Sequence, residues 1–280
     1  MGLEDYRQQI DIVDKELTKL FEKRMDIVLK VAEYKKQNNI EILNQNRESE
    51  VLQRVINQIN NKDYITETQS FFKDLFSTSR ELQKRKIQEQ KLLENISEKT
   101  KLGIPGTTGS FSQEAAQKFF SEKFEILQQI FYPTFAKVLE ALQKKEIDIA
   151  IMPIQNIIVG EVTETSELLK KQKYNIITYI TIKISHSLLV LQDVSLQDIK
   201  EIISHPQALA QCSYFIKKSG YKTREYTSTS TAAQLIQESN DKTVAAIAGK
   251  EAAKLFGLNI LKENIANNSN NYTQFAIITL

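Results

Sequence analysis

The sequence predicts a two-domain protein, with an all-α domain of three helices followed by an α/β domain. Two observations predict this fold class. In the first part of the chain, apolar residues recur three and four positions apart, which is the period of a buried helix face. From residue 101 onward, short β-branched segments alternate with helical ones, which indicates a sheet covered by helices. We expect the helical domain at residues 1–90, a charged helical linker at 91–100 and the α/β domain at 101–280.

Three helices account for the first domain. The first spans residues 3 to about 36 and the second residues 46 to about 59. The third begins at Thr66, where Gln69 is positioned to complete a capping box. At about 1.5 Å per residue the first helix reaches about 50 Å, which is too long to be buried within so small a domain. We therefore expect a homodimer formed through exchanged N-terminal helices.

Strands and helices alternate along the second domain. Helices are expected from about Ser112 and from Ala232, and over residues 208–218 and 250–256. The expected strands lie at residues 101–104, 147–152, 176–184, 187–191, 200–204, 244–248 and 275–279. Because α/β sheets bind ligands beyond the ends of their strands, the residues after 152 and 204 are candidate site positions.

Composition excludes several classes of protein. The formal net charge of +2 provides no basic surface for nucleic acid or an acidic membrane. No stretch approaches the roughly 18 apolar residues of a membrane span, and the acidic first residues do not resemble a signal peptide. Cys212 is the single cysteine, so no disulfide forms within the chain, and we expect a thiol buried in the core. These features predict a cytoplasmic protein.

Charged and polar side chains interrupt the apolar stripes of the three helices. A cation on such a stripe is costly unless it meets an anion. Arg24 and Lys35 are three helical turns apart and share a face, as do Ser79 and Gln83. Each arginine alone is compatible with a surface ion pair, but the whole set predicts a site for a small polyanion. The set comprises Arg7, Arg24, Lys35, Arg47, Glu48, Ser79 and Gln83.

Residues 3–83 resemble the all-helical chorismate mutases, specifically the N-terminal domain of bifunctional chorismate mutase/prephenate dehydratases. The matching stretches are YRQQID at 6–11, EKR at 22–24, VAEYK at 31–35, NRE at 46–48 and SRELQ at 79–83. The resemblance implies that Lys35 and Gln83 are catalytic and hydrogen-bond the ether oxygen of the breaking bond. It further implies that chorismate is bound by Arg7 from the other subunit and by Arg24, Arg47, Glu48 and Ser79. Asn44 stands where the family usually has aspartate and is still able to bind a hydroxyl.

The chemistry of that reaction agrees with the residues present. A Claisen rearrangement needs neither a nucleophile nor a proton transfer. It needs a reactive conformer held in place and stabilisation of negative charge on the ether oxygen, and cations and amide donors supply both.

Residues 101–280 resemble the prephenate dehydratase domain of the same family. The matching stretches are GTTGSFS at 106–112, PIQN at 153–156, HSLL at 186–189, SHPQ at 204–207, STSTAA at 228–233 and YTQF at 272–275. The resemblance implies two α/β lobes with a ligand cleft between them, as in type II periplasmic binding proteins. It implies Thr273 as the proton donor, and Ser110, Phe111, Ser112, Asn156, Ser230, Thr231 and Phe275 as substrate-binding residues.

The residues themselves favour a cleft for an anion. Ser110 to Ser112 and Ser230 to Ala232 are expected at helix N-termini, whose free N–H groups bind carboxylates. His205, before a proline at a strand end, is more typical of a cap than of a general acid. His186, within a strand, is expected to be structural.

Two departures from the family concern the second domain. Gln155 replaces a glutamate and Gln274 replaces an arginine beside Thr273. Either an ion pair has been exchanged for a neutral pair, or the dehydratase has lost activity. The main prediction is a cytoplasmic enzyme of phenylalanine biosynthesis, without metal or cofactor, that converts chorismate to prephenate and then to phenylpyruvate.

Three alternatives are kept. In the first, the second domain binds an aromatic acid as a sensor and has no catalytic activity. In the second, the second domain acts on arogenate and not on prephenate. In the third, the N-terminal helices serve only to form the dimer. The family's C-terminal ACT domain is expected to be missing, and with it feedback inhibition by phenylalanine through that domain.

Overall fold

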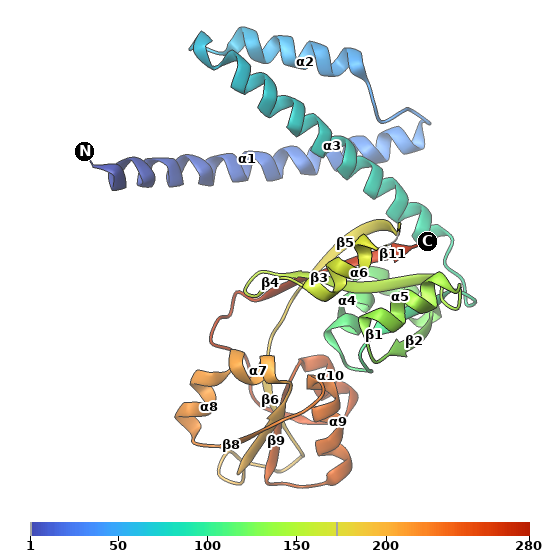
Figure 1. The fold of residues 1–280 in the computed structure, drawn as a ribbon, viewed down its shortest axis with the longest axis vertical. Helices are drawn as coiled ribbons and strands as arrows, with labels where there is room; N and C mark the ends of the chain where they lie inside the picture. Colours follow the sequence, from blue (N-terminus) through green and yellow to red (C-terminus); the bar gives the residue numbers. More distant parts are fainter. Residues whose placement is uncertain (1, 172) are drawn as a thin grey trace. The chain divides into compact units, whose positions relative to one another are not determined.

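The computed structural model describes residues 2–171 and 173–280 and divides the chain into two compact units, Met1–Glu94 and Asn95–Leu280 (Figure 1). The first unit is helical and the second is a mixed α/β structure. The predicted fold class is therefore confirmed. No helix in the described residues is both long enough and apolar enough to span a bilayer.

Three long helices form the first unit. They are α1 (Leu3–Gln37), α2 (Gln45–Gln58) and α3 (Ile65–Glu94), and α3 packs against both others. A short 3-10 turn, Lys62–Tyr64, leads directly into α3, so Thr66 lies inside the helix and the predicted capping box is wrong. Asn61 caps the turn instead, accepting a 3.0 Å hydrogen bond from the Asp63 amide. The helix ends at Glu94, and residues 95–100 are not helical.

The first unit buries few apolar side chains. Met25, Ala32 and Phe76 are its buried hydrophobic residues. In contrast, the apolar stripe of α1 is exposed, with 48% of Leu17 and 67% of Leu3 accessible to solvent. A helix face that is apolar but uncovered is typical of a surface that another chain covers.

The second unit consists of two lobes, each built on one sheet. In the first lobe the strand order is β2-β1-β3-β11-β5, and β4 pairs with β3. These strands are β1 (Lys101–Pro105), β2 (Gln128–Tyr132), β3 (Ile149–Asn156), β4 (Gly160–Glu161), β5 (Asn175–Lys183) and β11 (Tyr272–Thr279). The chain also forms α4 (Phe111–Phe120), a 3-10 helix (Ser121–Ile126), α5 (Phe135–Gln143) and α6 (Thr163–Lys170) here.

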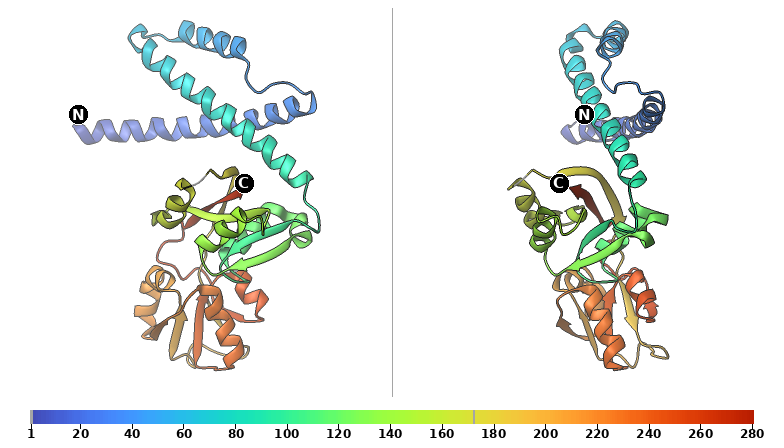
Figure 2. Two further views of the ribbon diagram at one scale, coloured as in Figure 1. Left: turned by 45° about the vertical axis from the view of Figure 1, so that its right-hand side comes forward. Right: turned by 90° about the vertical axis from the view of Figure 1, so that its right-hand side faces the viewer.

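In the second lobe the strand order is β10-β6-β9-β7-β8. The strands are β6 (Ser187–Val190), β7 (Glu201–Ser204), β8 (Lys222–Glu225), β9 (Val244–Ala248) and β10 (Asn259–Lys262). One face packs on α7 (Pro206–Gln211) and α8 (Ser213–Ser219), and the other on α9 (Thr229–Ser239) and α10 (Lys250–Leu255). Both views of Figure 2 show the orange lobe as a separate body from the green and yellow one.

Two segments carry the chain between the lobes. The first joins β5 to β6, and the second joins β10 to β11, so the last strand returns to the first lobe. The segments lie side by side, because the Ile184 amide donates to the Asn271 carbonyl at 2.8 Å and the Ile265 amide donates to the His186 carbonyl at 3.0 Å. The two hydrogen-bonded segments therefore form the connection between the lobes.

Every predicted strand of the second unit is present, but several elements were not predicted. They are β2, β4, β8, β10, α5 and α6. The helix expected over residues 208–218 is two helices, α7 and α8, interrupted at Cys212. Cys212 is fully buried, as predicted, and burial raises the pKa of its thiol to about 12. It is therefore a packing residue and not a nucleophile at neutral pH.

Candidate active sites

The predicted polar set of the first unit gathers partly between α1 and α3. Arg24 on α1 donates to the Ser79 hydroxyl on α3 at 2.5 Å, and Ser79 donates in turn to the Leu75 carbonyl at 2.6 Å. Gln83 is 7% exposed, and its Nε2 donates to the Ser79 carbonyl at 3.2 Å. Its Oε1 is buried and has no hydrogen-bond partner in the structure. An unsatisfied buried acceptor beside a desolvated arginine is a typical feature of a ligand site.

Lys35 and Glu48 form the second half of this cluster. The Lys35 ammonium donates to the Ile42 carbonyl at 2.5 Å. Burial lowers the pKa of Lys35, and the nearby Glu48 carboxylate partly opposes this by raising it. Glu48 itself is held by Arg80 at 2.5 Å, a contact that sequence analysis missed because Arg80 carries no helical-stripe signal. Burial also lowers the pKa of Arg24.

The remaining predicted residues of this unit lie apart from the cluster. Arg7 and Arg47 have side chains that are 63% and 56% exposed, and each pairs with a carboxylate three residues away. The Asn44 side chain caps α2 by accepting a 2.9 Å hydrogen bond from the Arg47 amide. Within one described chain, therefore, Arg24, Lys35, Glu48, Ser79 and Gln83 carry the buried contacts.

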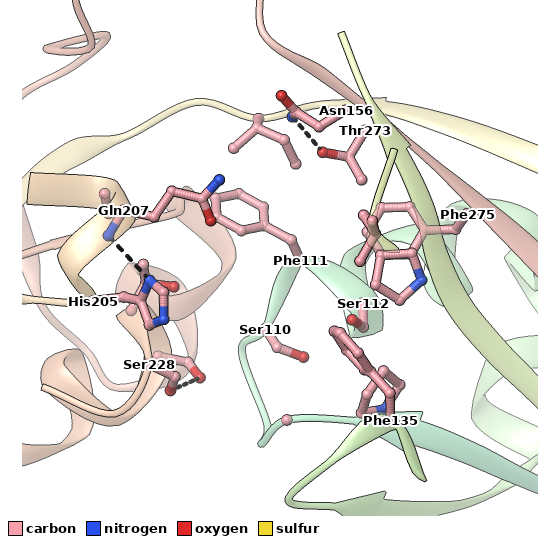
Figure 3. Close-up of a pocket in the computed structure, with 18 of the residues that line it drawn as sticks. Ser110, Phe111, Ser112, Phe135, Asn156, His205, Gln207, Ser228, Thr273 and Phe275 are labelled. Atoms are coloured by element: carbon pink, nitrogen blue, oxygen red, sulfur yellow. Dashed lines mark hydrogen bonds between the residues drawn. The ribbon is translucent and has the colours of Figure 1, made fainter. Parts of the chain in front are cut away.

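The second unit contains a cavity of about 550 Å³ between its two lobes. Most of the predicted dehydratase residues line it: Ser110, Phe111, Ser112, Asn156, Ser230, Thr273 and Phe275. Figure 3 shows Asn156 and Thr273 on one side of this cavity and His205, Gln207 and Ser228 on another. Thr231 is not a lining residue, because its hydroxyl completes a capping box with Ser228.

Three helices begin at this cavity. The N-cap residues of α4, α7 and α9 are Ser110, His205 and Ser228, and all three line it. His205 acts as a cap, since its Nδ1 accepts a hydrogen bond from the Gln207 amide at 3.2 Å. Among the described lining residues there is no lysine or arginine. A carboxylate entering here would be held by backbone and side-chain N–H and O–H groups.

A hydrogen bond from Asn156 orients the Thr273 hydroxyl. Thr273 is 8% exposed, and its Oγ1 accepts a 2.8 Å hydrogen bond from Asn156 Nδ2 (Figure 3). The Asn156 Oδ1 accepts from the amides of Ile158 and Val159, each at 3.0 Å. Because Thr273 accepts from Asn156, its own hydrogen remains available to donate to another group.

Other features of the cavity were not predicted. Gln211 and Asn271 line it, and both belong to a chain of part-buried hydrogen bonds that also contains His186. The Phe111 ring meets His186 edge-on at 5.7 Å, and any side chain at Gly249 would meet that ring at 3.0 Å. Among the described residues, no group of His, Cys, Asp and Glu is arranged to hold a metal ion.

Known proteins match both units. The family model for prephenate dehydratase matches residues 102–280, and that for chorismate mutase type II matches residues 6–84. A bifunctional chorismate mutase/prephenate dehydratase from Buchnera aphidicola subsp. Acyrthosiphon pisum is 35% identical over 98% of this chain and 71% of its own length. This chain belongs to the family of bifunctional chorismate mutase/prephenate dehydratases. The first unit contains its mutase domain and the second its dehydratase domain.

Solved structures agree with the dehydratase domain. A prephenate dehydratase from Arthrobacter aurescens, in complex with L-Phe, has a TM-score of 0.59 at 27% identity, covering 64% of this chain and 60% of that one. GqqA, described as a novel type of quorum-quenching acylase, has a TM-score of 0.57 at 26% identity, covering 64% of this chain and 63% of its own. The chain spans less than two thirds of both.

The two predicted departures from the dehydratase motifs, Gln155 and Gln274, do not line the cavity. Gln155 and Gln274 are register partners on β3 and β11. Neither lines the cavity, whereas Asn156, Thr273 and Phe275 do. Gln155 is exposed and Gln274 is half-buried, and the register shifts between Gln274 and Phe275, so the two glutamines are cross-strand neighbours outside the cavity.

Proposed function

We propose that this chain rearranges chorismate to prephenate and then converts prephenate to phenylpyruvate. The observation that carries the second step is the Thr273 hydroxyl, which accepts from Asn156 and keeps its hydrogen for a ligand. The family membership supports both steps. Neither the neutral Gln155–Gln274 pair nor any residue lining the cavity argues for a silent second domain.

For the mutase step, we propose that Arg24, Arg47 and Arg7 of a second subunit bind the two carboxylates, with Ser79 holding Arg24. Lys35 and Gln83 would donate to the ether oxygen as the C–O bond breaks. Glu48, fixed by Arg80, and Asn44 would bind the ring hydroxyl. The desolvation of Arg24 and Lys35 supports this assignment, because a cation removed from water interacts more strongly with an anion.

For the dehydratase step, we propose that Thr273 protonates the departing ring hydroxyl. The C–O bond breaks with its electron pair on oxygen, so that water leaves. The bond from the ring to its carboxylate also breaks, its electron pair completes the aromatic ring and carbon dioxide leaves. Solvent then returns a proton to Thr273. Ser110, Ser112 and Ser230 would orient the pyruvyl carboxylate, Thr231 would support them from α9, and Phe111 and Phe275 would contact the ring.

We also propose a homodimer formed through the N-terminal helices, and a cytoplasmic location. The exposed apolar stripe of α1 supports the dimer, since a second copy of the same stripe is a self-complementary partner. The single buried cysteine suits a reducing compartment.

The test is to supply the purified chain with chorismate and to follow prephenate and phenylpyruvate separately. We expect phenylpyruvate to accumulate. Thr273→Ala should still form prephenate but lose phenylpyruvate by about a hundredfold or more, whereas Thr279→Ala, at the other end of β11, should behave as the parent chain. Prephenate accumulation by the parent chain at every pH tested would instead support a second domain that only binds ligand.

A further inference from the structure

A directional chain of hydrogen bonds, exposed at its start and part-buried from Asn156 onward, ends on the Thr273 hydroxyl. It begins at the loop after β3, where the Asn156 side chain accepts from the amides of Ile158 and Val159. Backbone amides only donate, so the accepting atom is the Asn156 oxygen and the other atom is its NH2 group. That NH2 group uses both hydrogens, one toward Thr273 Oγ1 at 2.8 Å and one toward Asn271 Oδ1 at 2.7 Å.

The donor-to-acceptor direction of these hydrogen bonds also determines how Asn271 is oriented. Because its oxygen accepts from Asn156, its Nδ2 is the donor, and that atom lies 3.3 Å from Gln211 Oε1. Gln211 Oε1 therefore accepts, which makes His186 Nε2 the donor of the 2.8 Å bond between them. His186 is 3% exposed, its Nδ1 has no partner, and burial lowers the pKa of its ring, so it stays neutral near pH 7.

Asn271 holds the central position in this chain. It is 1% exposed and stands at the point where the second crossing segment enters β11. Its partners come from different parts of the dehydratase domain, Asn156 from β3 and Gln211 from the end of α7. Its carbonyl also accepts from Ile184 of the other crossing segment. Both polar atoms of the side chain are thus held by partners within the protein.

We infer that Asn271 is a positioning residue of the dehydratase, which fixes Asn156 so that the Thr273 hydroxyl presents its hydrogen to the substrate. This inference rests on the proposed function. It also assigns Asn156 a positioning role and not a substrate contact, since all four of its side-chain hydrogen-bonding positions are occupied within the protein. A small misplacement of a reacting group is costly in rate, by as much as about a hundredfold per ångström.

The experiment compares three variants of the full chain with prephenate as substrate. Asn271→Ala removes both hydrogen bonds, and we expect kcat to fall about tenfold to a hundredfold with KM changed less than about threefold. Asn271→Asp keeps an acceptor for Asn156, and its carboxyl, when protonated, can donate to Gln211. Burial raises the pKa of such a carboxyl, so this variant should recover activity toward acidic pH and lose it as the carboxyl ionises. Asn267→Ala is the matched control, since Asn267 lies on the same crossing segment but its side chain bonds only to Ala210, Ser213 and Tyr214 among the described residues.

Chorismate mutase turnover of the same samples reports the amount of chain, because its residues lie in the other unit, and recovery of Asn271→Asp at acidic pH reports a folded dehydratase domain. In a Thr273→Ala background, Asn271→Ala should lower the residual rate by less than about twofold. Unchanged kcat in Asn271→Ala, or Asn271→Asp behaving like Asn271→Ala at every pH, would overturn the inference while leaving the proposed function intact. A parent chain that makes no phenylpyruvate would overturn both.

Discussion

At the scale of single residues, the two sites handle anions by different means. In the mutase domain, Arg24 and Lys35 are cations with lowered pKa values caused by burial. In the dehydratase domain, the described cavity lining contains no lysine or arginine, and N-caps such as Ser110 and Ser228 take their place. The presence of cations in one site and their absence from the other match the two reactions. In the rearrangement, negative charge accumulates on one oxygen, which a cation stabilises. In the dehydration, a carboxylate must leave as carbon dioxide, and a fixed cation bound to that carboxylate would oppose its departure.

Lys35 should set the alkaline limit of the mutase. The proposed donation from Lys35 to the substrate needs the protonated ammonium, and burial lowers the pKa of Lys35 while the Glu48 carboxylate raises it. Mutase kcat/KM should therefore decline at lower pH than an ordinary lysine would dictate, and Glu48→Gln should move the decline to still lower pH. The measurement is chorismate consumption across the alkaline range. Glu67→Gln, an exposed carboxylate of α3, is the control, and an equal displacement in both variants would argue against the pairing of Lys35 with Glu48.

Sequence patterns predicted some site residues well and missed others for a physical reason. Thr273 and Asn156 occur in recognisable motifs, and both line the cavity. Gln211 and Asn271 carry no periodicity or spacing signal, because their contact joins residues 60 positions apart. Burial of a polar side chain, which marks Asn271 at 1% exposure, depends on tertiary packing and is not encoded locally.

At the scale of elements, long amphipathic helices and buried strands were predictable and edge elements were not. The apolar stripe of α1 predicted a helix over residues 3 to about 36, and the helix spans Leu3–Gln37. Central strands such as β9 are continuous apolar runs, which are recognisable in the sequence. In contrast, β8 is exposed along its whole length, and β2 has only three strand-forming residues, Ile130 to Tyr132, after two glutamines, so the strand signal of each is absent or short. Their strand conformation comes from pairing with β7 and β1.

The pairing of β3 with β11 predicts that the two glutamines are neutral for catalysis. Gln155 and Gln274 do not line the cavity, so Gln155→Glu combined with Gln274→Arg should change phenylpyruvate turnover by less than about threefold. The new ion pair should change the free energy of unfolding by about 0.2–1 kcal/mol. Steady-state kinetics with prephenate and thermal unfolding measure the two quantities. A loss of phenylpyruvate turnover comparable to that of Thr273→Ala would show that these two positions affect catalysis although they do not line the cavity.

The approach of α4 to α10 predicts a pH-dependent stability. Burial raises the pKa of Glu114 to about 7, the Glu251 charge adds to this, and Lys118 opposes it. An unfolded glutamate titrates near 4.5, so between these values the folded state binds more protons and the free energy of unfolding falls as pH rises.

Replacing the Glu114 carboxyl by an amide should remove this decrease in the free energy of unfolding. After allowance for the solvent-accessible part of the side chain, Glu114→Gln should gain about 1 kcal/mol at pH 8 and nothing at pH 5, about 2–4 °C in Tm. Differential scanning calorimetry at the two pH values measures it. The exposed Glu122 supplies the control variant, Glu122→Gln, and a parent chain equally stable at both pH values would refute the assignment.

At the scale of the whole molecule, the proposed homodimer accounts for two features of the mutase domain, its exposed apolar surface and the exposed position of Arg7. The apolar stripe of α1 is exposed, and Arg7 on the same helix pairs only with Glu4. Both are explained if a second copy of the chain covers the stripe and receives Arg7 in its own mutase site.

This arrangement predicts complementation between two inactive variants. Arg7→Ala and Arg24→Ala should each lose mutase activity by about a hundredfold or more, since each removes a cation that binds substrate. In a mixed dimer, one site combines Arg24 of the first chain with Arg7 of the second and is fully intact, while the other site lacks both. After random exchange of subunits at equal concentrations, half of the dimers are mixed and half of their sites are intact, so about a quarter of the parent turnover should return. Dehydratase activity, measured with prephenate, should be unchanged in both variants and in the mixture. Mixing without any gain, under conditions where labelled subunits demonstrably exchange, would mean that Arg7 serves the site of its own chain.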